Sequence, residues 1–270
     1  MLVRILTAVV ALPLFFAVVF FLPPFCLVLA VSALCAVAAY ELLWRTHAVT
    51  DRKAVFLACL LAAYIPLWIS YLKEIWMLFL GVFAVFVCLA AMWLKNEKQG
   101  SFSKLALTMF GGMIFPLLYA TLLLLRESEQ GLLVFLLPFI AAWTTDTGAY
   151  FVGRFLGKHK LAPVISPKKT VEGAVGGVLI CILCMVGYGV IVNRYFDGDF
   201  SLVFLAVAGL VLSVLSQMGD LSLSIIKREY NIKDYGGVFP GHGGILDRFD
   251  SVLFTAPATY FVLRIFALFV

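Results

Sequence analysis

Long apolar runs separated by short polar connections follow one another along the whole chain. A helix needs about 20 mostly apolar residues to cross a bilayer. Strands of a membrane barrel alternate in polarity at every second residue, and these runs do not alternate. The pattern therefore predicts an all-α, polytopic transmembrane helical bundle of about nine spans. The predicted spans cover roughly residues 5–22, 25–43, 54–72, 75–94, 105–125, 131–153, 171–192, 200–219 and 251–270.

The composition agrees with a chain that faces lipid over most of its surface. Hydrophobic residues make up 64% and charged residues 13%, whereas about 25% of a typical soluble domain is charged. Arg4 precedes the first run as in a signal peptide, but no small-residue cleavage site follows it. We therefore expect an uncleaved first span and a single integral-membrane domain over residues 1–270, with no nucleic-acid partner.

The basic residues predict the orientation. If the connections alternate sides, the N-terminus and the loops after spans two, four, six and eight hold all but four of the 20 Lys and Arg residues. Only Lys73, Arg126 and Arg194 fall on the opposite side, and Arg264 lies within the last span. By the positive-inside rule, the basic side and the N-terminus face the cytoplasm.

The two halves of the chain differ in polar content. Residues 1–130 are predicted to be scaffold spans with one clearly intramembrane acid, Glu41, which fits either an interface position or a functional role. Residues 131–270 carry two long cytoplasmic loops and the predicted active site. For Arg264 the sequence leaves snorkelling, pairing with Glu41 or Asp146, and contact with lipid headgroups open.

Acids and bases gather at the cytoplasmic ends of the four C-terminal spans. Ionisable residues at membrane depth are expensive and point to function. Helical spacing places several of them on common stripes. These stripes are Gln217, Asp220, Ser224 and Lys227 on span eight, and Asp146, Tyr150 and Arg154 on span six.

The acids of this group suit a hard cation. Carboxylates without thiolate neighbours favour oxygen-ligated ions, and Mg²⁺ is usually held by one or two carboxylates plus substrate phosphates. Asp220 and Asp247 are the first candidates, followed by Asp250 and Asp146. His242 is a lone imidazole among glycines, which is not a zinc site. Contact with phosphate or catalysis, and a structural loop role, are both open for it.

Glycines and basic residues near the same ends favour anion binding. Gly-rich pairs at 236–237 and 243–244 allow close backbone approach. Ser166 followed by Pro167 predicts a helix N-terminus aimed at the site. Gly173 and Gly177 form a GxxxG that is expected to pack against another helix. The CxxC at residues 181–184 lies mid-span and is expected to serve packing.

The stretch Ser224-Ile-Ile-Lys-Arg, Lys233-Asp234, Gly236, Pro240 and His242-Gly-Gly-Ile-Leu-Asp247-Arg-Phe-Asp250 resembles the signature of phosphatidate cytidylyltransferases, also called CDP-diacylglycerol synthases. Residues 143–177 also resemble a second region of that family. The resemblance implies that CTP and phosphatidate react to give CDP-diacylglycerol and pyrophosphate with Mg²⁺, in phospholipid biosynthesis. It further implies a homodimer, and we expect a bacterial inner-membrane protein with its active site facing the cytoplasm.

On this basis we assign residue roles. Mg²⁺ is expected at Asp220, Asp247 and Asp250, with a second cation left open. The expected catalytic residues are Asp220, Asp247, Lys227, Arg228 and His242. The expected substrate-binding residues are Lys168, Lys169, Thr170, Glu172, Ser224, Lys233, Asp234, Arg248 and Asp146.

Two other functions compete with this interpretation. A CTP-dependent membrane lipid-alcohol kinase would transfer a phosphoryl group instead of a cytidylyl group. A lipid or anion transporter would also place acids in broken helices, but usually near the bilayer midplane. The acids of this chain are predicted at one membrane face, which favours the transferase.

Overall fold

The computed structural model describes residues 2–95, 101–128, 130–238 and 243–266, and these are almost entirely helical. Within them, seven helices are long and apolar enough to cross a membrane, and two shorter apolar helices cover Val9–Phe20 and Val252–Ile265. The prediction of an all-α integral membrane protein is confirmed. The count of nine spans and the side of the N-terminus stay predictions.

The chain forms two compact units. Unit 1 consists of Met1–Leu124 and Glu229–Phe249, and unit 2 of Leu125–Arg228 and Asp250–Val270. The segment that follows the longest helix therefore belongs to the unit of the N-terminal helices. The boundary between Phe249 and Asp250 falls inside the segment that carries the strongest sequence pattern.

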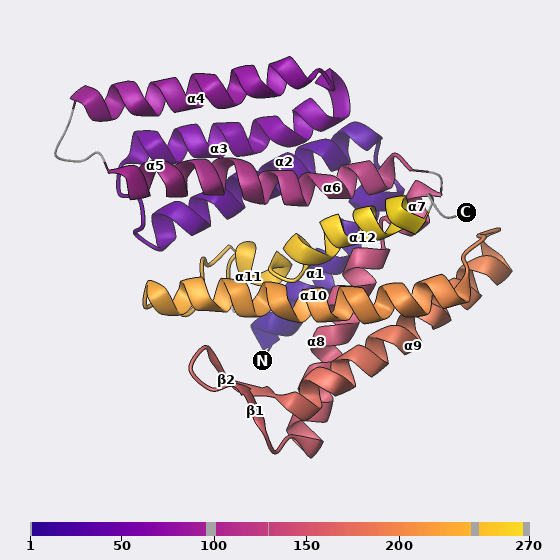
Figure 1. The fold of residues 1–270 in the computed structure, drawn as a ribbon. Coiled ribbons are helices and arrows are strands. Elements are labelled where there is room, and N and C mark those ends of the chain that lie inside the picture. Colours follow the sequence, from indigo (N-terminus) through magenta and orange to yellow (C-terminus); the bar gives the residue numbers. More distant parts are fainter. Residues whose placement is uncertain (1, 96–100, 129, 239–242, 267–270) are drawn as a thin grey trace. The chain divides into compact units, whose positions relative to one another are not determined.

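Unit 1 is built around α3. This helix packs against α2 on one side and against α4 on the other, as Figure 1 shows, and it also contacts the turn η3. The elements of unit 1 are α1 Leu2–Phe20, α2 Pro24–Tyr40, η1 Glu41–Arg45, α3 Arg52–Leu67, η2 Trp68–Leu72, α4 Ile75–Lys95, α5 Phe102–Met109, η3 Phe110–Ile114, α6 Phe115–Arg126, whose last two residues belong to unit 2, and α11 Leu246–Phe249.

Local signals set several helix starts in unit 1. Asp51 caps α3 by accepting a hydrogen bond from the amide of Lys53 at 2.9 Å, and Ser101 caps α5 through the amide of Lys104 at 3.2 Å. Pro24 occupies the first position of α2, where a missing N–H costs nothing. The segments η1, η2 and η3 are π-helical turns, which often occur at functional positions.

Unit 2 consists of four longer helices and one small hairpin. Its elements are α7 Gly131–Val134, α8 Leu137–Leu156, β1 Lys160–Ala162, β2 Ser166–Thr170, α9 Val171–Tyr195, α10 Leu202–Glu229, whose last residue belongs to unit 1, and α12 Val252–Phe266. The strands β1 and β2 pair antiparallel between α8 and α9. The hydroxyl of Thr145 on α8 donates to Ser213 on α10 at 2.9 Å, and Thr255 on α12 donates to the carbonyl of Pro138 at 3.1 Å.

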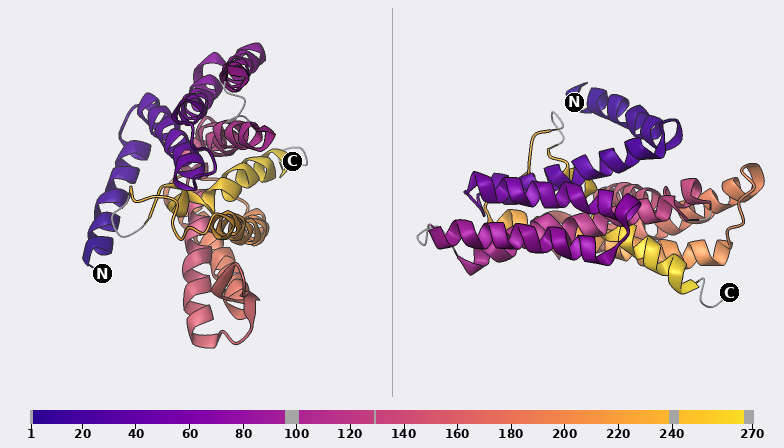
Figure 2. Two further views of the ribbon diagram at one scale, coloured as in Figure 1. Left: turned by 90° about the vertical axis from the view of Figure 1, so that its left-hand side faces the viewer. Right: turned by 90° about the horizontal axis from the view of Figure 1, so that it is seen from above.

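Small residues bring α8 and α9 into close contact, and Figures 1 and 2 show the two helices side by side. A Cβ on Gly173 would lie 2.7 Å from the carbonyl oxygen of Ala149, and one on Gly177 would lie 2.8 Å from that of Thr145. The predicted packing role of this GxxxG is confirmed. Cys181 lies one turn further along, in the buried core of unit 2 beside Met185 and Leu212.

The prediction of a helix beginning at Pro167 is wrong. Ser166–Thr170 is strand β2, and α9 begins at Val171. Thr170 is the true N-cap, because its hydroxyl accepts a hydrogen bond from the amide of Gly173 at 3.1 Å. Proline is compatible with this position because β2 is an edge strand of a two-stranded sheet.

Candidate active site

Asp220 is the centre of a charged cluster in unit 2. It lies on α10, which runs as one helix to Glu229 and so confirms the predicted stripe. The Lys169 ammonium, on β2, forms an ion pair with the Asp220 carboxylate, and both side chains are about three-quarters buried. The Ser224 hydroxyl lies 3.5 Å from Asp220, one turn further along α10. Gln217, on the same stripe, donates to the carbonyl of Ala174 on α9 at 3.2 Å.

A glycine lets the start of the last helix approach this cluster. A Cβ on Gly219 would lie 2.9 Å from the carbonyl oxygen of Asp250 and 2.9 Å from the ring of Phe254. A side chain at this position would force the Asp250 backbone or the Phe254 ring to shift, so glycine is favoured here. Because of this close approach, the segment that begins at Asp250 packs against α10 at Gly219, the residue before Asp220.

Asp250 is held among like charges. Its carboxyl is buried, and Oδ1 accepts a hydrogen bond from the amide of Ser251 at 2.7 Å. Burial, followed by the negative charges of Asp220 and Asp146, raises the pKa of Asp250 to about 8, against a smaller opposing effect of Lys227. Four residues that the sequence assigned to the site therefore interact within unit 2.

This arrangement fits a hard divalent cation. The three carboxylates offer only oxygen donors, and a cation would relieve the repulsion that raises the pKa of Asp250. The buried hydroxyls of Ser216 and Ser251 make no hydrogen bond within the described part of the chain. No three acidic, histidine or cysteine side chains among the described residues form a ready-made metal site. The donor set suits an ion that completes its coordination with further oxygen ligands.

The hairpin beside the cluster uses several predicted residues for its own structure. Glu172 accepts hydrogen bonds from the amides of Lys158 and His159 at 3.0 and 3.2 Å, and pairs with the His159 ring at 2.6 Å. Arg228 donates through Nε to the carbonyl of Ile165 at 3.0 Å. Lys168 is exposed on β2. Glu172 therefore organises the hairpin, and Arg228 ties the end of α10 to it.

Asp247 lies in unit 1 and holds a loop together. Its Oδ2 accepts hydrogen bonds from the amides of Tyr235 at 2.7 Å and Gly244 at 2.9 Å. Gly243 adopts φ +89°, a conformation that favours glycine, and a Cβ there would lie 2.8 Å from Asp247 Oδ2. The hydroxyl of Tyr119, on α6, donates to the carbonyl of Phe249 at 3.0 Å. We call residues 235–238 and 243–249 the signature loop.

The remaining predicted residues of this region lie outside the buried contacts. Lys233, Asp234 and Arg248 are exposed. His242 lies outside the described residues, so its predicted role stays a prediction. Glu41, which the sequence left open, accepts hydrogen bonds from the signature loop. Its intramembrane charge was the only signal that marked it.

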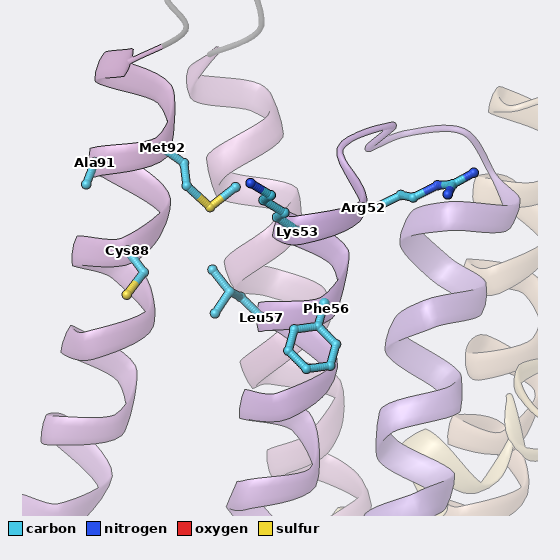
Figure 3. A pocket seen from close by; sticks show the side chains of 7 residues that line it. All are labelled: Arg52, Lys53, Phe56, Leu57, Cys88, Ala91 and Met92. Atoms are coloured by element: carbon cyan, nitrogen blue, oxygen red, sulfur yellow. The ribbon is translucent and has the colours of Figure 1, made fainter.

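An apolar hollow of about 510 Å³ lies between α3 and α4 in unit 1. Figure 3 shows Phe56 and Leu57 of α3 opposite Cys88 and Met92 of α4, with the Lys53 side chain reaching toward Met92. None of the predicted site residues lines it. Arg264, on α12, lies over the ring of Tyr260 at 5.4 Å, one turn earlier in the same helix.

Comparison with known proteins defines the class. Residues 2–266 match the model of the cytidylyltransferase family, and the chain belongs to this family. It is similar to the phosphatidate cytidylyltransferase of Bacillus subtilis, with 45% identity over 144 residues, 53% of this chain and 52% of the relative. The enzyme of the same name from Staphylococcus saprophyticus is 47% identical over 146 residues, 54% of this chain and 52% of the relative. The matched regions thus span about half the length of these curated relatives.

Proposed function

We propose that this protein transfers a cytidylyl group from CTP to phosphatidate, giving CDP-diacylglycerol and pyrophosphate. A phosphate oxygen of phosphatidate attacks the α-phosphorus of CTP, and the bond from that phosphorus to the bridging oxygen of the β-phosphate breaks. The nucleophile is already anionic near neutral pH, so no strong general base is required. This agrees with a site made of carboxylates and lysines.

The cluster of Asp146, Asp220 and Asp250 with Lys169 and Lys227 is the observation that carries this proposal. Bringing two polyanions together needs positive charge and ordered donors. Lys169 and Lys227 would neutralise phosphate oxygens of CTP and the lipid. Ser224, beside Asp220, offers a hydroxyl to the same groups. The exposed Lys168 would attract the triphosphate from solution.

Asp220 and Asp250 would hold Mg²⁺, and Asp247, which the residue pattern predicted as a ligand together with Asp220, keeps that prediction. When bound, the ion supplies charge neutralisation for the triphosphate and the leaving pyrophosphate. The raised pKa of Asp250 supports a cation at this position, because a cation favours the ionised carboxylate. Asp146 would orient a ligand of the ion or a substrate hydroxyl.

The proposal extends to topology and assembly. The basic residues favour about nine spans, a cytoplasmic N-terminus and a site that faces the cytoplasm, where CTP is available. The family resemblance suggests a bacterial inner membrane and a homodimer. These features concern access to substrates, and the reaction itself does not depend on them.

Product labelling tests the reaction. The full chain in detergent is incubated with phosphatidate, Mg²⁺ and CTP that carries label in the cytosine ring or in the γ-phosphate. We expect cytosine label in the lipid fraction and γ-label in pyrophosphate. In a parallel reaction with a lipid alcohol in place of phosphatidate, transfer of γ-label to the lipid would instead identify a kinase. Uptake of an anion into vesicles without CTP consumption would identify a transporter.

Cation dependence tests the residue assignment. In Asp220→Asn and Asp247→Asn, CTP consumption with phosphatidate is measured over a series of Mg²⁺ concentrations. We expect activity to fall by about 100-fold or more at low Mg²⁺. Either variant with wild-type activity at low Mg²⁺ would remove that residue from the assignment.

A further inference from the structure

Glu41 joins the scaffold helices to the signature loop. It follows the last residue of α2 as the first residue of η1, and it is 1% exposed. Its carboxylate accepts hydrogen bonds from the amides of Ile245 at 3.1 Å and Leu246 at 2.8 Å. The sequence separation is 204 residues for the first contact. The N-terminal half of the chain therefore contributes a carboxyl group to the loop that carries Asp247.

Two glycines of the signature loop surround this carboxylate. A Cβ on Gly236 or on Gly244 would overlap the Glu41 oxygens. The Cα of Gly244 would also lie 3.1 Å from a Cβ on Gly236, so the two described parts of the signature loop meet at Glu41. The position of Glu41 explains why both residues are glycine, because a side chain at either position would displace the Glu41 carboxyl group.

Glu41 and Asp247 together order one short stretch of backbone. Asp247 accepts from the amide of Gly244, and Glu41 accepts from the next two amides, those of Ile245 and Leu246. Three successive amides are thus held by two carboxylates. A buried amide without a partner is costly, so these hydrogen bonds hold the stretch in place. This stretch leads directly into the helical turn α11, where Asp247 lies.

The burial of Glu41 is costly, which argues against a purely packing role. Its neighbours in η1, Leu42 and Leu43, are buried apolar side chains. An acid in such surroundings is unfavourable unless its oxygens are hydrogen-bonded. An apolar residue would complete the scaffold at lower cost. The acid is useful because it binds the amides of the loop.

We propose that Glu41 is a positioning residue for the cytidylyl transfer proposed above. It fixes the backbone of residues 244–246 and thereby sets the direction of the Asp247 side chain. It does not touch substrate in this role. The proposal rests on the proposed function for its kinetic consequences, but the anchoring of the loop can be measured without any reaction.

Kinetics of Glu41→Ala and Glu41→Gln provide the first test. Alanine removes both hydrogen bonds. Glutamine keeps one acceptor oxygen but turns an NH₂ group toward the other amide, so it restores part of the anchoring. We expect kcat to fall by about 10- to 100-fold in Glu41→Ala, as for outer-shell partners of ligands. We expect a smaller loss in Glu41→Gln, a higher Mg²⁺ concentration for half activity in both, and a KM for phosphatidate within about twofold.

Hydrogen exchange provides the second test. In the full chain in detergent, peptides that cover residues 244–248 should exchange at least about tenfold faster in Glu41→Ala than in the wild type. Peptides of α8 and α9 should not change. Thr108→Val is the matched control in unit 1, because the buried Thr108 hydroxyl bonds only the carbonyl of Lys104 in its own helix among the contacts described. It should leave loop exchange and Mg²⁺ dependence at wild-type values.

The outcomes separate the two proposals. Unchanged exchange at residues 244–248 in Glu41→Ala would overturn the anchoring role. Faster exchange with wild-type kcat and Mg²⁺ dependence would overturn the positioning role. An equal loss in Thr108→Val would make the effect one of general stability and would also overturn it. If the wild type transfers no cytidylyl group, the proposed function fails, while the exchange result still decides whether Glu41 anchors the loop.

Discussion

Asp247 and Asp250 are three residues apart in the chain, yet they lie in different units and in opposite kinds of surroundings. Asp247 accepts two backbone hydrogen bonds from the signature loop, so its charge is compensated by ordered amides. Asp250 faces two further acids and is buried, so its charge is opposed. The two acids of this motif therefore lie in different surroundings: Asp247 is hydrogen-bonded to backbone amides, whereas Asp250 is buried near other acids.

The same contrast holds for the residues around each acid. Glu41 supports Asp247 by binding the adjoining amides, and glycines make room for both acids. Asp250 is flanked by Asp220, which pairs with Lys169. The signature loop fixes the position of Asp247, and the cluster in unit 2 brings several charged side chains together. Variants of the two regions should therefore fail in different ways.

The largest effect is expected for Asp250→Asn. Loss of one carboxylate from the cluster removes a proposed cation ligand without removing a long-range anchor of the fold. Cytidylyl transfer should fall by about 100-fold or more, while hydrogen exchange in the signature loop should stay unchanged. Asp199→Asn, at an exposed acid in the connection between α9 and α10, is the control and should keep wild-type activity. Equal activity of the two variants would contradict the proposed role of the cluster.

A smaller effect is expected for Gly243→Ala in the signature loop. The new Cβ would meet Asp247 at 2.8 Å, and φ +89° is strained for alanine by about 1–3 kcal/mol. Displacement of the loop should lower kcat by about 10- to 100-fold and speed up loop exchange. Gly237→Ala is the matched control, because a Cβ there meets nothing within 4 Å. A normal kcat for Gly243→Ala would show that the loop geometry is not needed.

Gly219→Ala should perturb the other region more mildly. The methyl group would push against the carbonyl of Asp250 and the ring of Phe254, both at 2.9 Å. Overpacking of this kind costs about 1–3 kcal/mol, and we expect about a tenfold loss of activity with unchanged exchange in the signature loop. Gly187→Ala places its Cβ in open space and should behave as the wild type in activity and thermal stability. Faster hydrogen exchange of the signature loop in Gly219→Ala would contradict the conclusion that the loop and the cluster in unit 2 have separate roles.

The smallest effect concerns pH and stability without divalent cations. Because the pKa of Asp250 is raised from its ordinary value of 3.8 to about 8, the folded protein binds more protons than the unfolded protein between these values. Stability should therefore fall as pH rises through this window. With a chelator present, the unfolding midpoint in detergent should drop by a few degrees between pH 6 and pH 8. Asp250→Asn should lose less over the same range, and an identical drop would contradict the assignment.

Much of this protein could be predicted from local patterns. Apolar runs predicted the helices because a span must satisfy its own backbone and face lipid along its length. Spacing predicted the stripe of Asp220 and Ser224, because three- and four-residue steps share a face in any α-helix. The pattern Gly173–Gly177 predicted close helix packing, since small residues allow backbones to approach. Each of these signals lies within a few turns of one element.

Other features depend on residues that are far apart in the chain. The sequence around Ser166 favoured a helix start, but pairing with β1 made it a strand and moved the cap to Thr170. Lys169 was an expected phosphate ligand, and its partner Asp220 became visible only when β2 and α10 came together.

The signature segment 224–250 was the strongest pattern in the sequence, and the sequence determined its membership in a helical membrane enzyme family. Only the tertiary structure divided it between two units and brought Glu41 to its backbone. The physical reason is that hydrophobic periodicity depends on residues in neighbouring turns of one element. A buried carboxylate instead accepts hydrogen bonds from whichever nearby amides the fold leaves unpaired, and these can be far away in the chain.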